Sequence, residues 1–257
     1  MSGFEGERIA KVMARAGLCS RRDAERLIGE GRVKLNGAAL TSAAVNVTSK
    51  DQVMVDGQPL PQKDETKLWR YHKPGGLVVS NHDPEGRPTV FDKLRQQLPR
   101  VLSIGRLDIN TEGLLLLTND GGLARFLELP ATGWIRRYRV RAYGQIDETA
   151  LGKIANGVEI DGVKYGPIDA KLESAKGDNQ WLTIAIKEGK NREVKRICEY
   201  LGLQVNRLIR TSFGPFILGE LARGGIEEVP PKAMKSAVGE KFFKRDDANR
   251  RRKIQRP

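Results

Sequence analysis

An aspartate in an unusual setting is the first candidate for chemistry in this sequence. Asp108 closes the segment Gly105-Arg106-Leu107-Asp108, and the run of four leucines at 114–117 that soon follows predicts a buried strand. Aspartate is disfavoured in strands, so its place beside apolar residues calls for a reason. That reason is either a turn, in which the carboxylate caps Asn110 or Thr111, or a functional carboxylate that acts as a nucleophile or base.

A tyrosine and a group of cations are the next candidates. Tyr138 alternates with arginines at 137, 139 and 141 in a predicted strand, so it points away from them, toward the core. After the turn at Glu188-Gly189, basic residues crowd the start of a predicted helix at 193–201, where they oppose the helix macrodipole. This conflict predicts a nearby anion, either RNA phosphate or a carboxylate such as Asp108. The basic residues at this turn are Lys190, Arg192, Lys195 and Arg196.

Composition divides the chain into the parts that must position these residues. Residues 1–60 have the pattern of two helices and a small sheet, and residues 61–67 read as a linker. Residues 68–231 alternate apolar strands with short helices and hold all the candidates above. Residues 232–257 contain ten Lys or Arg against three Asp or Glu, a net charge of +7. Their few apolar residues predict a disordered basic tail.

The first part carries a basic helix pair. Ser20 stands three residues before Asp23, which predicts a capping box at the start of the second helix. The region from 8 to 34 holds three acids and eight cations. It is either a solvated surface or a phosphate-binding face, and the shortage of acids to neutralise the cations favours phosphate binding. A DNA-binding helix-turn-helix is the rival, although the strand predicted directly after Gly31 argues against it. The eight cations are Arg8, Lys11, Arg15, Arg21, Arg22, Arg26, Arg32 and Lys34.

Charge and composition narrow the class of protein. The 257 residues include 45 Lys and Arg against 32 Asp and Glu, a net charge of +13, which points to nucleic acid first and an acidic membrane second. Two cysteines and two histidines exclude a disulfide framework and a cysteine-rich zinc site. The sequence has no transmembrane run, signal peptide, Rossmann fingerprint or P-loop. We therefore expect a cytoplasmic, polyanion-binding protein with no cofactor and no metal.

Longer motifs resemble two known families. Residues 7 to about 57 resemble the S4 RNA-binding domain in their helix spacing, Ser-Arg-Arg helix start and Gly-Arg-Val-x-Leu-Asn-Gly turn. The chain from there to about Pro231 resembles the pseudouridine synthases, in the branch that acts on ribosomal RNA and carries an N-terminal S4 domain. The motif Gly-Arg-Leu-Asp-x-x-Thr-x-Gly-Leu-Leu-Leu is intact at 105–116, with HKPGGLVVS at 72–80 and EGKNREVKRI at 188–197. The segment at 81–92 looks most like the large-subunit synthase B subgroup.

The resemblance implies a fold and a reaction. The fold would be α+β, with a small N-terminal S4 domain before a catalytic domain whose mixed, mostly antiparallel sheet is flanked by helices. The reaction would isomerise a uridine of 23S ribosomal RNA, near the peptidyl-transferase region, to pseudouridine. Asp108 matches the family's essential aspartate and Tyr138 its active-site tyrosine. Lys195 matches the basic residue that pairs with the aspartate and would keep it ionised, although many relatives have the two-pronged arginine there.

The expected partner is ribosomal RNA, free or in an assembling large-subunit particle, bound by a monomer. By resemblance, Arg106 would enter the space that a flipped base leaves. The alternatives are the same reaction on 16S ribosomal RNA and a non-catalytic S4 protein of ribosome assembly. The expected RNA contacts are Arg15, Arg21, Arg22, Arg26, Arg32, Lys34, Lys73, Arg87, Arg106, Arg137, Arg139, Lys190, Arg192 and Arg196.

Overall fold

The computed structural model of the chain describes residues 6–62, 64–239 and 242. Contacts divide the chain into two compact units. The first comprises Met1–Lys67, Asn119–Gly121 and Val238–Pro257, and the second comprises Leu68–Thr118 and Gly122–Ala237. No helix in the described ranges is both long and apolar enough to cross a membrane.

The first unit contains the predicted helix pair and small sheet. Apolar side chains from both helices and from the strands form its core, in which Ile9, Met13, Ala24 and Val33 are fully buried. The strands β3, β2, β5 and β6 form an antiparallel sheet in that order, and β1 pairs with β4. The elements are β1 (Glu7–Arg8), α1 (Ile9–Arg15), α2 (Arg21–Gly29), β2 (Val33–Leu35), β3 (Ala38–Ala39), β4 (Asn46–Val47), β5 (Val53–Val55) and β6 (Gln58–Pro59).

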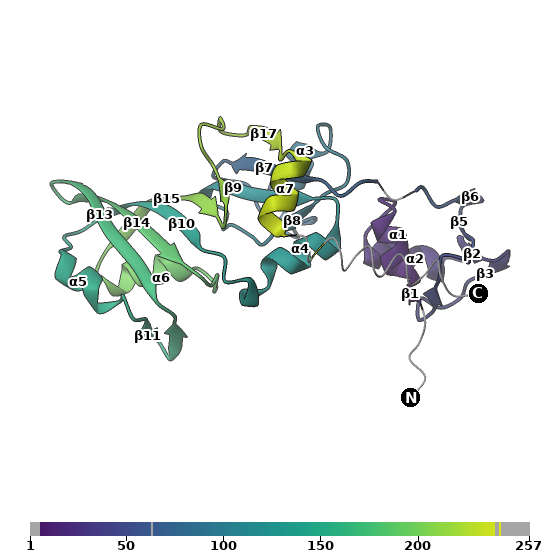
Figure 1. Ribbon diagram of the computed structural model, residues 1–257, viewed down its shortest axis with the longest axis horizontal. Helices are drawn as coiled ribbons and strands as arrows, with labels where there is room; N and C mark the ends of the chain where they lie inside the picture. The colour runs from purple at the N-terminus through teal and green to yellow at the C-terminus, as the bar shows by residue number, and fades with distance from the viewer. Residues whose placement is uncertain (1–5, 63, 240–241, 243–257) are drawn as a thin grey trace. The chain divides into compact units, whose positions relative to one another are not determined.

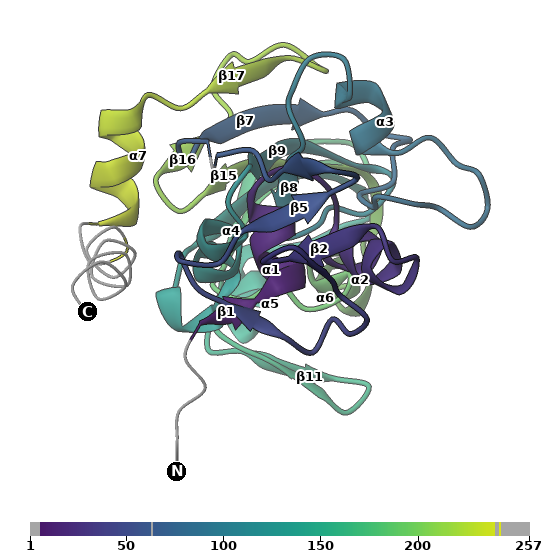
Figure 2. The same cartoon turned by 90° about the vertical axis from the view of Figure 1, so that its right-hand side faces the viewer.

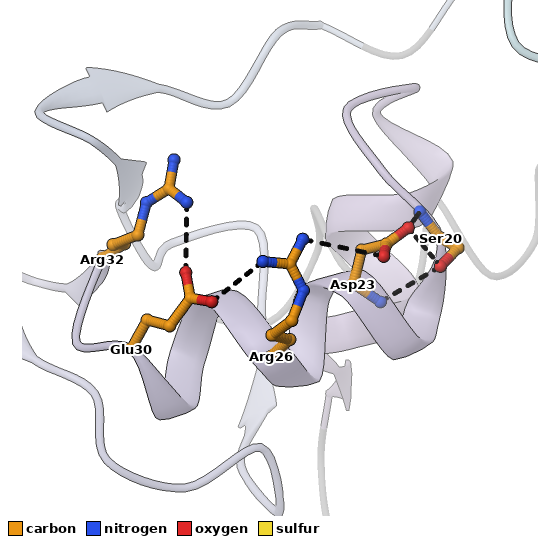
Figure 3. Close-up of polar contacts among 5 residues, drawn as sticks. All are labelled: Ser20, Asp23, Arg26, Glu30 and Arg32. Carbon is orange, nitrogen blue, oxygen red and sulfur yellow. Dashed lines mark hydrogen bonds and ion pairs between the residues drawn. The ribbon is translucent and has the colours of Figure 1, made fainter.

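The capping box predicted at the start of α2 is confirmed. The Ser20 hydroxyl accepts a hydrogen bond from Asp23 N at 3.1 Å, and the Asp23 carboxylate accepts one from Ser20 N at 3.2 Å (Figure 3). Two N–H groups that a helix start leaves without intrahelical partners are thereby satisfied. The box therefore fixes where the basic helix begins.

We expect Ser20→Ala to destabilise the first unit by about 1 kcal/mol, because Asp23 N loses its acceptor. Hydrogen exchange of the amides at 21–24 in the full chain should become faster, and the unfolding temperature should fall slightly. Thr41→Ala is the control, because Thr41 is exposed in the same unit and its side chain makes no hydrogen bond to any described residue. Equal exchange in Ser20→Ala and wild type would show that the box contributes nothing.

A single nine-stranded sheet organises the second unit. Its main path runs β13-β14-β10-β15-β9-β7-β17, with β16 on β15 and β8 on β9. All pairings are antiparallel except β15 with β9, so the prediction of a mixed, mostly antiparallel sheet is confirmed. The strands are β7 (Leu68–Lys73), β8 (Leu102–Ile104), β9 (Thr111–Thr118), β10 (Arg136–Tyr143), β13 (Ile168–Lys176), β14 (Asn179–Ile186), β15 (Gln204–Phe213), β16 (Phe216–Ile217) and β17 (Ile226–Glu228).

Short helices and one hairpin complete this unit. Side chains of α5 and α6 join those of β10 and β14 in one apolar core, so both helices pack on the same face of the sheet. Figure 1 shows them together below β13 and β14, and Figure 2 shows β17 beside β7 at the far edge. The remaining elements are α3 (Val90–Leu94), α4 (Gly121–Glu128), a 3₁₀ turn (Pro130–Thr132), α5 (Glu148–Lys153), β11 (Val158–Ile160), β12 (Val163–Tyr165), α6 (Glu193–Tyr200) and α7 (Pro231–Val238).

The predicted start of the disordered tail at residue 232 is wrong. The chain continues from Pro231 as α7, in which Met234 and Val238 are 3% and 7% exposed. These two residues lie four apart, so they share one helix face and can be buried together. The high charge of the segment concealed this short apolar pattern. Apart from Phe242, residues 240–257 lie outside the described part of the chain.

Candidate active site

Asp108 lies in the loop between β8 and β9. Its main-chain carbonyl, rather than its side chain, accepts the hydrogen bond from Thr111 N at 2.9 Å. The side chain is 35% exposed, and its Oδ2 lies 3.5 Å from Lys195 Nζ. Of the two interpretations open for this aspartate, the geometry favours a functional carboxylate over a turn cap.

The Asp108 carboxylate borders a cavity of about 1090 Å³ within the second unit. Tyr138, 8% exposed, and Lys195, whose side chain is 15% exposed, line the same cavity. A carboxylate, an ammonium and a phenol therefore meet in one space large enough for a nucleotide base. The predicted residues that the cavity brings together are Arg106, Asp108, Tyr138, Lys190, Arg192 and Lys195.

The close contact of β9 with β15 sets the position of this loop. Gly113 has φ +101°, and a Cβ added there would lie 2.3 Å from the carbonyl oxygen of Arg210. Only glycine permits this approach, because any side chain would push the two strands apart. Arg210 also lies opposite Tyr138 on β10, with a bulge beside that pair. The start of β9, which follows Asp108, is thereby fixed relative to Tyr138, with only β15 between the two strands.

The helix α6 brings Lys195 to the carboxylate. Its N-cap is Arg192, which has a left-handed backbone (φ 53°) and provides no side-chain cap. Such a conformation costs about 1 kcal/mol or more in a residue with a side chain, and it occurs here at the cavity edge. The predicted conflict between cations and the helix start is eased by two carboxylates, Asp108 opposite Lys195 and Glu193 in the first turn.

Glu193 is a buried carboxyl group that the sequence interpretation missed. It is 3% exposed, and its Oε2 accepts a hydrogen bond from Lys190 N at 2.7 Å. Its Oε1 has no hydrogen-bond partner among the described residues. Burial raises the pKa of Glu193 to about 7, and the nearby Glu188 carboxylate adds to this effect. Its only sequence signal was an acid in a first helical turn, which predicts exposure to solvent and not burial.

A pH-dependent stability follows from Glu193. Its pKa in the folded chain lies above the ordinary value of 4.5, so its contribution to stability is complete below pH 4.5 and lost as the pH rises through 7. We expect Glu193→Gln to match wild type near pH 5 and to exceed its stability at pH 8 by on the order of 1–3 kcal/mol. Urea unfolding at both pH values measures this. The exposed Glu159→Gln is the control, and an equal difference at pH 5 and pH 8 would contradict the assignment.

Lys73 is not an RNA contact, and the prediction for it is wrong. Its side chain is fully buried, and Nζ donates to the carbonyl oxygens of Pro74, Ile109 and Thr111 at 3.0, 3.0 and 2.9 Å. Burial lowers the pKa of Lys73 to about 8. Two of its acceptors, the carbonyls of Ile109 and Thr111, lie just after Asp108, so Lys73 anchors the loop that carries Asp108.

The arginines of β10 divide between its two faces. Arg136 is 8% exposed, lines the cavity and donates to the carbonyl oxygens of Trp134 and Lys187 at 3.0 and 2.7 Å, so it is not free to bind phosphate. Arg137 and Arg139 are exposed on the opposite face, away from Tyr138 as predicted. They therefore cannot contact RNA inside the cavity. Arg196 does not line the cavity either.

Several predicted RNA contacts have acidic partners instead. Arg87 lies 2.7 Å from Asp83 and 2.9 Å from Glu85. In the first unit, acids approach half of the eight cations, which corrects the expectation that too few acids were present. These pairs are Lys11 and Arg15 with Glu7, Arg26 with Asp23 and Glu30, and Arg32 with Glu30 and Asp56. Figure 3 shows the pairs of Arg26 with Asp23 and Glu30 and of Arg32 with Glu30. The other four cations, Arg8, Arg21, Arg22 and Lys34, have no acidic partner among the described residues, and three of them, Arg21, Arg22 and Lys34, are predicted RNA contacts.

Comparison with known proteins identifies the families of both parts of the chain. Residues 67–200 match the family described as RNA pseudouridylate synthase, and residues 7–53 match the S4 domain. An uncharacterised RNA pseudouridine synthase of Rickettsia felis is 48% identical over 228 residues, which cover 89% of this chain and 99% of the relative. A ribosomal large subunit pseudouridine synthase B of Pasteurella multocida is 43% identical over 232 residues, 88% of this chain and 67% of the relative. A crystal structure of a pseudouridylate synthase, 28% identical, superposes with a TM-score of 0.63 and covers 91% of this chain and 100% of that one.

Proposed function

Because the chain belongs to the RNA pseudouridylate synthase family and carries an S4 domain, we propose that it isomerises a specific uridine of large-subunit ribosomal RNA to pseudouridine. Membership of this family makes it an isomerase. The observation that carries the proposal is the Asp108 carboxylate, 3.5 Å from the Lys195 ammonium in a cavity that Tyr138 also lines.

The reaction requires little beyond these side chains. The bond between C1′ of the ribose and N1 of uracil breaks, the base turns, and a bond from C1′ to C5 forms. The proton on C5 leaves, and N1 takes up a proton in its place. Substrate and product are isomers, so no electrons and no atoms need to be supplied from outside. We infer that the chain works without a cofactor and that one carboxylate starts the cleavage.

Each cavity residue has a part in this scheme. Asp108 is the essential carboxylate, and the neighbouring Lys195 favours its ionised form. The Tyr138 ring stacks on the uracil and its hydroxyl accepts the C5 proton. A uridine within an RNA helix must be flipped out to reach them, and Arg106 at the exposed edge of the cavity takes its place in the stack.

The large-subunit target rests on the name of relatives such as the Pasteurella protein, and a pseudouridine map tests it. Pseudouridines in 23S and 16S ribosomal RNA should be mapped in a strain that lacks this gene. We expect one position to be lost from 23S RNA and restored by the plasmid-borne gene. A position lost from 16S RNA would redirect the enzyme to the small subunit. No lost position in either RNA would favour a ribosome-assembly protein that binds without modifying.

A further inference from the structure

The outer face of the large sheet, opposite the reaction cavity, carries a second group of cations. Residues of β10 alternate between buried and exposed, so Tyr138 and Val140 face the cavity and the core while Arg137, Arg139 and Arg141 face outward. The apolar side chains of α5 and α6 pack on the inner face, and α5 also reaches the edge of the sheet, where Glu148 lines a hollow together with Arg137 and Lys171. RNA bound in the cavity therefore cannot contact the outward-facing arginines.

Strand register extends this row of cations across the sheet. Arg141 lies opposite Trp181 on β14 and Arg207 on β15. Arg139 lies opposite Thr183, which in turn lies opposite Lys171 on β13. Neighbouring strands are about 4.8 Å apart and alternate residues along a strand about 6.7 Å apart, so these side chains form one continuous patch. We call this the outer patch, made of Arg137, Arg139, Arg141, Lys171, Trp181 and Arg207.

Part of the charge on the outer patch is free. Arg139 Nε lies 2.8 Å from Glu173, and Arg207 Nε lies 2.9 Å from Glu112. Arg137 and Lys171 have no acidic partner among the described residues, and Arg141 contacts only the amide oxygen of Asn179 at 3.3 Å. Three uncompensated cations on one strand face and its neighbour attract a polyanion.

An aromatic side chain lies among these cations. The Arg139 guanidinium lies 4.3 Å from the centre of the Trp181 ring, and Trp181 is partly exposed on the same face. An exposed indole with a guanidinium over its ring is the kind of platform on which an unpaired base stacks. An acidic protein segment would use the charge but not this platform, so the patch suits RNA better.

We propose that the outer patch binds a second, single-stranded segment of the substrate RNA, with phosphates on Arg137 and Arg141 and a base on Trp181. The identity of the RNA rests on the proposed function, whereas the binding itself does not. The segment that holds the reacting uridine occupies the cavity, and a more distant segment of a long RNA follows β10 on the other face. The enzyme would thus prefer long RNA to a short hairpin.

The test measures RNA affinity without turnover. A fluorescent 30-nucleotide poly(U) strand and a transcribed 23S ribosomal RNA fragment are titrated against the full chain by anisotropy at several salt concentrations. For Arg137→Ala/Arg141→Ala we expect the slope of log affinity against log salt to fall by about 0.7 for each lost single-strand phosphate contact. We also expect at least about tenfold weaker binding of both RNAs at 0.1 M salt. Lys93→Ala/Lys153→Ala, which removes two exposed helix cations from the same unit, should change neither quantity.

A second readout reports stacking on Trp181. RNA should quench tryptophan fluorescence in wild type, and Trp181→Phe should lose that part of the quenching. An unchanged salt slope in Arg137→Ala/Arg141→Ala, or equal quenching with and without Trp181, overturns the proposal. Tritium release from C5-labelled uridine, measured separately on wild type, tests the proposed reaction. If wild type releases no tritium but Arg137→Ala/Arg141→Ala has a reduced salt slope, the proposed reaction is refuted while RNA binding by the outer patch is supported.

Discussion

Replacing Asp108 with asparagine should reduce isomerisation by at least about a thousandfold, roughly 4 kcal/mol in the activation barrier. Asparagine matches aspartate in size but has no negative charge, so it can neither attack the sugar or base nor assist elimination. The cavity keeps its shape, since among the described residues the Asp108 carboxylate contacts only Lys195, at 3.5 Å. Release of tritium from RNA labelled at C5 of uridine measures the loss directly.

The same variant should still bind RNA. The predicted RNA contacts Arg21, Arg22 and Lys34 of the first unit are unaffected by the change, and removing an acid from a basic cavity slightly favours phosphate. Asp161→Asn is the matched control, because Asp161 lies in the exposed β11–β12 turn at φ 50°, a conformation that asparagine accepts. Normal tritium release in Asp108→Asn would remove the carboxylate from the mechanism, whereas lost RNA affinity would indicate that the variant had altered the fold.

The strands that carry the site were predictable because their patterns are local. The alternation in 136–143 assigns Tyr138 to the buried face and its neighbouring arginines to the exposed one. The leucine run after Asp108 marks a strand buried on both faces, and all eight residues of β9 are buried. The crowding of cations after the turn at 188–192 predicted a nearby anion, and Asp108 lies 3.5 Å from one of them, Lys195. In each case the signal lies within about ten residues.

The errors concern charges whose partners lie far along the chain. Lys73 is buried because its acceptors, the carbonyls of Ile109 and Thr111, come from a loop more than thirty residues away. Arg136, which was not among the expected RNA contacts, also donates to a distant carbonyl, that of Lys187. Both cations satisfy main-chain oxygens and are not free to bind phosphate. Sequence composition counts such charges, but only the fold shows which of them are neutralised or buried.

The acids of the first unit illustrate the same point at the surface. Arg32 pairs with Asp56, which is brought to it by the pairing of β2 with β5. The Arg32 side chain is nearly half exposed, so this pair is worth little in stability, yet it still reduces the charge offered to RNA. Of the six predicted RNA contacts in this unit, Arg21, Arg22 and Lys34 therefore keep their charge uncompensated among the described residues.

Lys73→Met should impair both stability and catalysis. Methionine fills the space but leaves the carbonyls of Pro74 and Thr111 without their donor, while Ile109 keeps a bond from Gly76 N at 2.7 Å. Each buried carbonyl left unsatisfied costs roughly 1–3 kcal/mol, partly offset by removal of a buried charge, so we expect about 3 kcal/mol in urea unfolding. The loosened loop should misplace the Asp108 carboxylate by up to about 1 Å and slow isomerisation about a hundredfold, mostly in kcat.

The pH dependence of this loss separates Lys73 from an ordinary packing residue. Burial lowers the pKa of Lys73 to about 8 from 10.5, so between these values the unfolded chain binds more protons and the wild type gains stability as the pH rises. Methionine has no such gain, and the stability deficit of Lys73→Met should therefore be larger at pH 10 than at pH 7. Lys153→Met, at an exposed site on α5, should show no deficit at either pH. A deficit in Lys73→Met that stays constant from pH 7 to 10, with unchanged kcat, would mean that Lys73 only fills space beneath the loop.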